Sequence, residues 1–282
     1  MTPADKLAAA GARVRFAAEV SKGEALGLGR AALLIGAEEE PSRCDVGRCV
    51  ESLEMMGREA AGRIRAGGGS PVEALNRYLF EEQGFAGNRT DYYDPRNSML
   101  HRVLERRTGI PITLSVVYME VGRRAGVRVE GIGMPGHFIV RASNADGAGT
   151  LVDPFDGRNI EADDCQERLD AIYGGQVALS EKHLRPVGSR AILTRILGNL
   201  KAVYAQANLH RRALAAVERI LLVSPHAREE RRDRGLLLAE LDRLPEAVVE
   251  LRRYLKSATD APDAESVREQ LKKIQSRLAS LN

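Results

Sequence analysis

The segment Leu104–Ser115, which reads LERRTGIPITLS, decides the fold of this chain. It starts in a helix predicted over 99–107 and passes through a turn at Gly109-Ile110-Pro111. The run that follows is strongly apolar and predicts a helix over 112–125, closed by Gly126. We therefore arrange the other predicted elements around this central helix.

Strands are predicted on the carboxyl side of the central helix. Two strand-like runs, 127–131 and 137–142, are separated by the turn Gly133-Met134-Pro135-Gly136. A third strand, over 150–153, completes a hairpin with the second. Helices followed by a small antiparallel sheet indicate the α+β fold class.

The amino-terminal part of the chain is predicted to be helical. Apolar positions over 5–40 fit two helices with a short break, and Asp45 begins a third helix. The glycine run 67–69 ends that helix, and Ser70 and Pro71 supply the cap and first residue of a fourth. These helices flank the core.

An internal repeat with a period of 34 residues marks the carboxyl-terminal part. The matched pairs are Tyr204 with Leu238, Ala213 with Ala247, Leu214 with Val248, Val217 with Leu251, Ile220 with Tyr254 and Leu221 with Leu255. This period is typical of tetratricopeptide helix pairs, and a helix over 264–281 is the natural cap. The alternative is a helical bundle whose periodicity is accidental.

Composition narrows the classes of function. Of the 282 residues, 44% are apolar and 29% are charged, as in globular proteins. The net charge is only +3 and no stretch is strongly basic, so nucleic acid is not a predicted partner. Apolar runs such as Ala31–Ala37 are far shorter than the roughly 20 residues that span a bilayer. We expect a cytosolic protein that does not bind a membrane.

No metal or cofactor is predicted. The cysteines form no Cys-x-x-Cys pair, so neither a disulfide framework nor a zinc site is indicated; they are Cys44, Cys49 and Cys165. A metal site would have to combine His137 with scattered carboxylates, namely Asp94, Asp153 and Asp156. Protein metal sites usually need three or four converging ligands, which makes this the weakest of the functional alternatives.

His137 and Asp153 are the residues that most suggest chemistry. His137 follows Pro135-Gly136 at the start of a predicted strand, and Asp153 ends the next strand. If the hairpin register places Ile139 opposite Asp153, side-chain alternation puts both residues on one face, where the carboxylate can orient the imidazole. A slip of one residue separates them. The alternative is a structural histidine and a turn aspartate.

Five motifs follow one another along the chain: NRYLFEEQGF at 76–85, YYDPRNS at 92–98, LERRTGIPITLS at 104–115, PGHF at 135–138 and DPF at 153–155. Together they resemble the SirB family of bacterial transglutaminase-like proteins. The resemblance covers about residues 15–190, and members commonly carry a tetratricopeptide tail. It implies a papain-like α+β core, in which a nucleophile at the start of a buried helix faces a His and an Asp on neighbouring strands.

The chain departs from the catalytic pattern of the wider superfamily at the nucleophile. His137 and Asp153 match, but the position of the catalytic Cys falls near 111–113, where this chain has no Cys. Thr113 or Ser115 could instead serve as an oxygen nucleophile, with His137 as base and Asp153 as orienter. That triad requires His137 Nε2 within about 3 Å of a hydroxyl. The alternative is that both hydroxyls are buried and bonded to backbone.

The polar loop before the central helix holds the candidate ligand-binding residues. Asn97 and Ser98 either cap the helix that begins near Met99 or contact a ligand, and Tyr93 joins them as a candidate. Glycine-rich, aromatic loops of this kind are usually ordered and often carry function.

These observations predict a transglutaminase-like domain over 1–188 and a tetratricopeptide tail with a capping helix over 189–282. The first functional hypothesis is a cytosolic, non-catalytic or weakly catalytic protein that binds a protein or peptide partner through the repeats and the inherited cleft. The second is a hydrolase or acyltransferase that uses Ser115 or Thr113 with His137 and Asp153.

Overall fold

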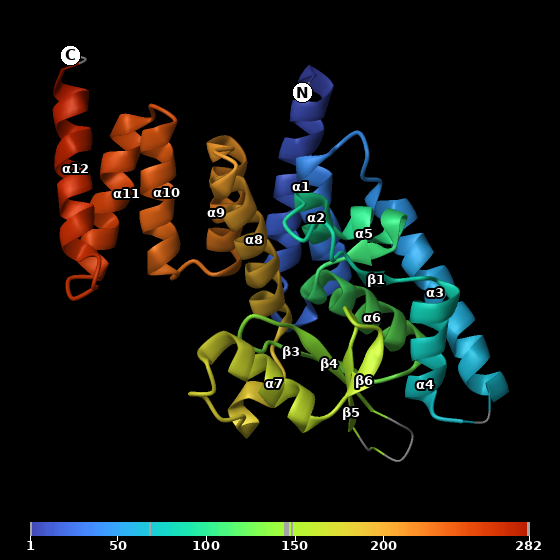
Figure 1. Cartoon of the computed structure of the whole chain (residues 1–282). Helices are drawn as coiled ribbons and strands as arrows, with labels where there is room; N and C mark the ends of the chain where they lie inside the picture. The colour runs from blue at the N-terminus through green and yellow to red at the C-terminus, as the bar shows by residue number, and fades with distance from the viewer. Residues whose placement is uncertain (1, 68, 144–146, 148, 281–282) are drawn as a thin grey trace. The chain divides into compact units, whose positions relative to one another are not determined.

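The computed structural model describes residues 2–67, 69–143, 147 and 149–280. It divides into two compact units, one that ends at Ile196 and one that begins at Leu197 (Figure 1). The division lies within helix α8, Ser189–Gln206, whereas the boundary predicted after residue 188 falls at the start of that helix. Each unit is described below by itself.

The first unit opens with the predicted helices. They are α1 (Pro3–Val20), the short 3₁₀ turn η1 (Gly23–Ala25), α2 (Leu28–Glu39) and α3 (Val46–Gly67). Thr2 and Asp5 form a capping box at the start of α1, in which each side chain accepts a hydrogen bond from the other residue's backbone N–H. Because α1 ends at Val20 and α2 begins at Leu28, the predicted break between the first two helices is confirmed.

The next segment contains more structure than the sequence predicted. Its elements are α4 (Pro71–Asn76), which continues as the π-helix η2 (Arg77–Glu82), strand β1 (Ala86–Gly87), the 3₁₀ helix η3 (Pro95–Ser98), α5 (Leu100–Arg106) and strand β2 (Thr108–Gly109). As predicted, Ser70 caps α4 by accepting from Glu73 N–H. The expected turn at 109–111 is partly a strand, because β2 pairs in parallel with β1.

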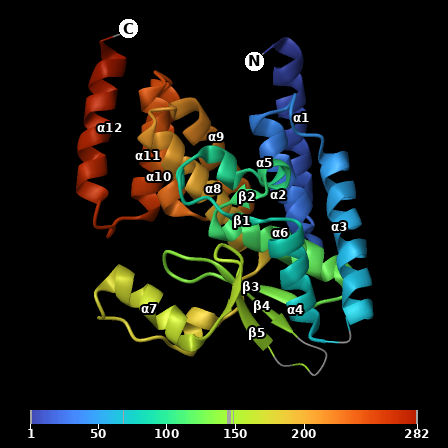
Figure 2. The ribbon, with the colours of Figure 1, turned by 45° about the vertical axis from the view of Figure 1, so that its right-hand side comes forward.

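Helix α6 (Pro111–Ala125) is the central helix of the first unit. It contacts α2, α3 and α5 on one side and strands β3 and β4 on the other, as Figures 1 and 2 show. Gly126 ends it in the left-handed conformation, with φ of 84°. Two glycines permit the close approach: Gly57 of α3 faces the Cβ of Arg124, and Gly122 faces Val129.

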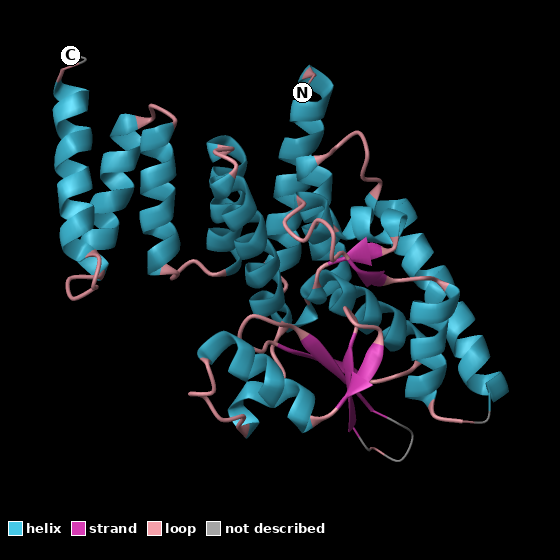
Figure 3. Cartoon of the chain, in the orientation of Figure 1, coloured by secondary structure: helices cyan, strands magenta, loops and turns pink. Residues whose placement is uncertain are grey.

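The sheet is a four-stranded antiparallel meander in the order β3-β4-β5-β6, magenta in Figure 3. Its strands are β3 (Val129–Ile132), β4 (Ile139–Ser143), β5 (Gly149–Asp153) and β6 (Arg158–Ile160). Helix α7 (Ala162–Tyr173) packs on the face away from α6, where Cys165 and Leu169 join Ile139 in one apolar cluster. A 3₁₀ turn, η4 (Glu181–Leu184), follows. The sequence did not predict β6, α7 or η4.

The second unit confirms the helical repeat. After α8 come α9 (His210–Val223), α10 (Arg228–Glu240), α11 (Leu244–Ser257) and the capping helix α12 (Ala264–Ala279). Ala213 and Ala247, the matched small residues, are both completely buried. Asn208 and Asp242 also lie 34 residues apart, and both turns use the left-handed conformation, with φ of 55° and 58°. Leu281, the predicted end of the cap, lies outside the described residues.

Two glycines of α3 provide a matched test of how closely α3 packs on α6. A Cβ at Gly57 would collide with Arg124, whereas a Cβ at Gly62 would meet nothing within 4 Å. We expect Gly57→Ala to lower the free energy of unfolding by about 1–3 kcal/mol through overpacking. Gly62→Ala should raise it by about 0.5–1 kcal/mol, because alanine favours a helix. Urea denaturation measures the free energy of unfolding of both variants. An increase in both would show that α3 packs on α6 less closely than described.

Candidate functional site

The structure brings His137 and Asp153 together. Val140 pairs with Val152, so the register places Ile139 opposite Asp153, which is the arrangement that aligns the two residues. His137 Nε2 lies 2.8 Å from Asp153 Oδ2. His137 is not in the strand as predicted, because β4 begins at Ile139 and His137 lies in the turn before it. Gly136 holds that turn with φ of 64°.

Asp153 is the centre of a buried polar network. Its side chain is completely buried and accepts from His137, from Arg168 of α7 and, at 2.9 Å, from Phe155 N–H. Burial alone would raise the pKa of Asp153, but the hydrogen bond from His137 and the charge of Arg168 hold it below its ordinary value. Arg168 also contacts Asp156 at 2.7 Å, which extends the network toward the surface. Asp153 is therefore an ionised carboxylate that orients the imidazole.

The predicted oxygen-nucleophile triad does not form. The Thr113 hydroxyl is completely buried and lies 2.6 Å from the Asn97 carbonyl and 3.1 Å from the Ile110 carbonyl. Ser115 is also completely buried, and its Oγ has no hydrogen-bond partner among the described residues. His137 Nε2 is engaged by Asp153 instead of a hydroxyl. For Thr113 the structure therefore agrees with the alternative, a buried hydroxyl that is hydrogen-bonded to backbone.

Asn97 stabilises the polar loop and does not cap a helix. Its Nδ2 donates to the carbonyls of Asp91 and Tyr92, at 2.7 and 3.2 Å, and its Oδ1 accepts from Asn88 at 3.0 Å. The N-cap of α5 is Met99, which makes no side-chain capping bond, so the capping hypothesis is wrong for Asn97 and Ser98. Both are buried in the loop.

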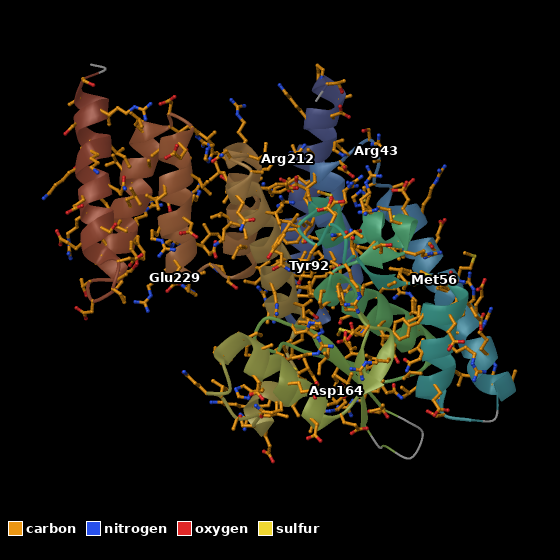
Figure 4. All side chains as sticks on the ribbon, viewed as in Figure 1. Arg43, Met56, Tyr92, Asp164, Arg212 and Glu229 are labelled. Atoms are coloured by element: carbon orange, nitrogen blue, oxygen red, sulfur yellow. The ribbon has the colours of Figure 1, made fainter. Side chains whose placement is uncertain are left out.

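Aromatic side chains lie beside His137, and we call Tyr92, Tyr93 and Phe155 the aromatic cluster. The Phe155 ring is 6.3 Å from the His137 ring and 6.1 Å from Tyr92, which is labelled in Figure 4. Tyr93 is 67% exposed and meets Tyr92 edge to face at 5.4 Å. Phe155 packs on Gly87, where any Cβ would strike its ring. The cluster gives the His137 turn an exposed apolar border.

Sequence reasoning missed two contributors to this site. Phe155 was part of a quoted motif, but only the contact with Gly87 shows where its ring lies. Arg168 was missed because α7 was not predicted, although the acidic residues Asp163 and Asp164 in its first turn could have indicated the start of a helix. None of the three cysteines lies in α6, and no group of three or more metal-binding side chains occurs among the described residues.

Comparison with known proteins agrees with this architecture. A family model described as transglutaminase-like superfamily matches residues 48–198, and a tetratricopeptide repeat model matches 200–272. A UPF0162 protein of Xylella fastidiosa strain 9a5c is 43% identical over 202 residues, covering 70% of this chain and 71% of its own. A UPF0162 protein of Pseudomonas aeruginosa is 30% identical, over 75% of this chain and 77% of its own. Protein SirB1 of Salmonella typhimurium is 24% identical, over 72% of this chain and 76% of its own. No solved structure matches significantly.

The network around Asp153 predicts a stability loss with a defined pH dependence. We expect Asp153→Asn to lower the free energy of unfolding by about 3–5 kcal/mol at pH 7, because it leaves buried partners uncompensated. A carboxyl whose pKa is depressed on folding stabilises the protein above its unfolded value, here 3.8, and loses that contribution as the pH falls through the folded value. The difference from wild type should therefore shrink below about pH 4.

Asp156→Asn is the matched control for that experiment. Asp156 is partly exposed and shares Arg168 with Asp153, so its loss should cost about 1 kcal/mol or less. Denaturant titrations between pH 3 and 7 measure both variants. Equal losses of unfolding free energy in the two variants would contradict the conclusion that Asp153 is an ionised carboxylate at the centre of the network. A loss for Asp153→Asn that does not change with pH would contradict it as well.

Proposed function

Because this chain belongs to the transglutaminase-like superfamily, in a SirB-like family with a tetratricopeptide tail, and its core helix begins without a thiol, we propose that it is a non-catalytic protein- or peptide-binding module. The observation that carries the proposal is the start of α6. Pro111, Ile112 and Thr113 form the first turn of α6, and the resemblance implies that catalytic members of the wider superfamily have their nucleophile there. A His–Asp pair without a nucleophile can orient and bind a group but cannot form an acyl intermediate.

The environment of Thr113 supports this proposal. A hydroxyl with an ordinary pKa needs a neighbouring general base to attack a carbonyl, whereas a thiol is activated far more easily. The Thr113 hydroxyl is shared between two backbone carbonyls and is sealed from solvent. Breaking the bond to Asn97 would leave that buried carbonyl without this partner, which costs about 1–3 kcal/mol. Thr113 is therefore suited to holding the polar loop on α6.

His137 and the aromatic cluster form the proposed binding surface of the first unit. Within the described chain, His137 Nδ1 has no protein partner, while Asp153 fixes the ring through Nε2. The ring is thus oriented to make one further hydrogen bond, for example with a peptide N–H group. Tyr92 and Tyr93 supply exposed aromatic area of the kind that dominates peptide recognition. An extended peptide with an apolar or aromatic side chain fits this chemistry.

The repeats support a protein partner. Tetratricopeptide arrays bind partners on extended surfaces built by stacked helix pairs. In the second unit, Leu209, Leu222 and Val249 are exposed apolar side chains available for such contacts.

No helix in the described part of the chain is long and apolar enough to cross a membrane. The cytoplasmic location stays a prediction that cell fractionation would test.

Peptide selection tests the proposal. Peptides selected from a phage-displayed random library on the immobilised full chain should bind in solution when labelled and followed by fluorescence anisotropy. We expect Tyr93→Ala to raise their Kd at least about tenfold, since truncating a central aromatic anchor typically costs about 2 kcal/mol or more, and about 1.4 kcal/mol is tenfold in Kd. Leu7→Ala, at an apolar side chain of α1 that is 77% exposed, is the control and should leave the Kd unchanged. A loss of affinity equal in both variants would contradict a role for the cluster.

The non-catalytic assignment has its own test. The full chain should neither incorporate a fluorescent amine into a glutamine-rich protein nor hydrolyse a nitrophenyl ester above the background rate. His137→Gln provides the comparison, because contaminating enzymes would be unaffected by it. Turnover that is present in the wild-type chain and abolished in His137→Gln would overturn the proposal.

A further inference from the structure

A cavity of the first unit lies where the start of α2 meets the carboxyl-terminal half of α6. Its volume is about 620 Å³, within the roughly 300–1,000 Å³ that is typical of small-molecule sites. The wall combines residues of η1, α2 and α6 with the segment that leads into β3 and with Ser189 at the start of α8. Its described lining includes no residue of the His137 site.

Apolar side chains make up much of the wall. Leu26, Leu28 and Val127 are buried there, and Met119 of α6 and Val129 of β3 are partly buried. Covering apolar surface of this kind with an apolar group, in place of water, is favourable. The cavity can therefore hold the apolar body of a small organic molecule.

The charged residues of the wall are four arginines and two glutamates, which leaves a net charge of +2. They are Arg30, Arg123, Arg124, Arg128, Glu24 and Glu120. A positive lining favours an anionic ligand and disfavours a cationic one. A net charge this small suits a ligand with one acidic group better than a polyanion.

Glu120 is already neutralised within the protein. Its carboxylate accepts from Gly29 N–H at 3.0 Å and forms an ion pair with Arg124, which also donates to the Glu120 carbonyl at 2.9 Å. Position 29 requires glycine, because a Cβ there would lie 2.6 Å from the Glu120 carboxyl carbon. Arg128 is likewise paired, with Glu130 at 2.8 Å. These residues shape the wall and offer little charge to a ligand.

Arg30 and Arg123 are held less closely. Arg30 lies 3.5 Å from Glu19 and Arg123 lies 3.4 Å from Glu120, whereas strong charge-assisted hydrogen bonds measure about 2.7–2.9 Å. Their side chains are 55% and 66% exposed, so both can turn toward a ligand. The carboxylate that opposes them on the wall is that of Glu24, an exposed residue of η1.

We propose that this cavity binds a small organic anion that has an apolar body and one acidic group, and that Arg30 and Arg123 hold the acidic group. A guanidinium group binds a carboxylate through two parallel N–H···O bonds, while the apolar wall covers the remainder of the ligand. Ligand sites in general combine a mostly apolar lining with a few polar groups that fix orientation. Binding here depends neither on His137 nor on the repeats.

The test uses the dye anilinonaphthalene sulfonate, which has an apolar aromatic body and one acidic group, and whose fluorescence rises in apolar surroundings. We expect saturable binding to the full chain, with a Kd that rises as NaCl is added, because salt screens exposed charges. Decanoate should displace the dye. Decanol has the same chain without the charge, and should displace the dye much less.

Three variants measure the contribution of each charge. Arg30→Gln and Arg123→Gln should each raise the Kd of the dye about two- to fivefold, the strength of exposed ion pairs. Glu24→Gln should lower the Kd by a similar factor, because it removes the opposing charge. Arg65→Gln, near the end of α3, removes the same charge outside the cavity and should leave the Kd unchanged. All four side chains are exposed, so the variants should fold, which urea denaturation checks.

Tyr93→Ala shows whether the dye binds the aromatic cluster instead, and we expect no change in Kd. Three results would overturn the proposal. The first is the absence of saturable dye binding by the wild-type chain. The second is displacement by decanol that equals displacement by decanoate. The third is a Kd that does not change in Arg30→Gln and Arg123→Gln, whether or not it changes in Tyr93→Ala.

Discussion

Close packing of helix α6 on both of its sides is the constraint on which the rest of the first unit depends. Gly57 admits Arg124 on the α3 side, and Gly122 admits Val129 on the sheet side. Larger residues at either glycine would push a layer outward. On the sheet that packs there, the register of β4 against β5 brings the turn before β4 to the end of β5, where His137 reaches Asp153. The site is thus built on one of the two layers that α6 holds.

Buried polar groups connect the polar loop to α6 and the sheet to α7. Asn97 gathers the loop around its amide, and its own carbonyl is the partner of Thr113 at the first turn of α6. Asp153, at the end of β5, accepts hydrogen bonds from His137 in the turn before β4 and from Arg168 of α7. Asn97, Thr113 and Asp153 are each buried and hydrogen-bonded, as a buried polar group must be to avoid a large desolvation cost. What resembles a catalytic arrangement is therefore also a structural one.

Local patterns predicted the fold better than they predicted the site. The central helix, the hairpin and the 34-residue repeat leave periodic signals over ten or more residues, and all three are present. The register of Ile139 against Asp153 was one of two arrangements that the sequence allowed. The partner of Thr113 lies 16 residues away, and Arg168, a partner of Asp153, is on a helix that the sequence analysis did not predict. Such long-range polar contacts have no periodicity to reveal them.

The left-handed residues Asn208 and Asp242 bear on how the tail can evolve. Each lies in the short turn between the two helices of a pair, at the same position in the 34-residue period. Asparagine and aspartate are the non-glycine residues that adopt this conformation most readily, so the turn does not depend on one rare residue. A duplicated block of 34 residues would meet its neighbours with the same backbone geometry on both sides. The array can therefore lengthen or shorten in whole modules, which would change the extent of its surface while leaving the first unit unaltered.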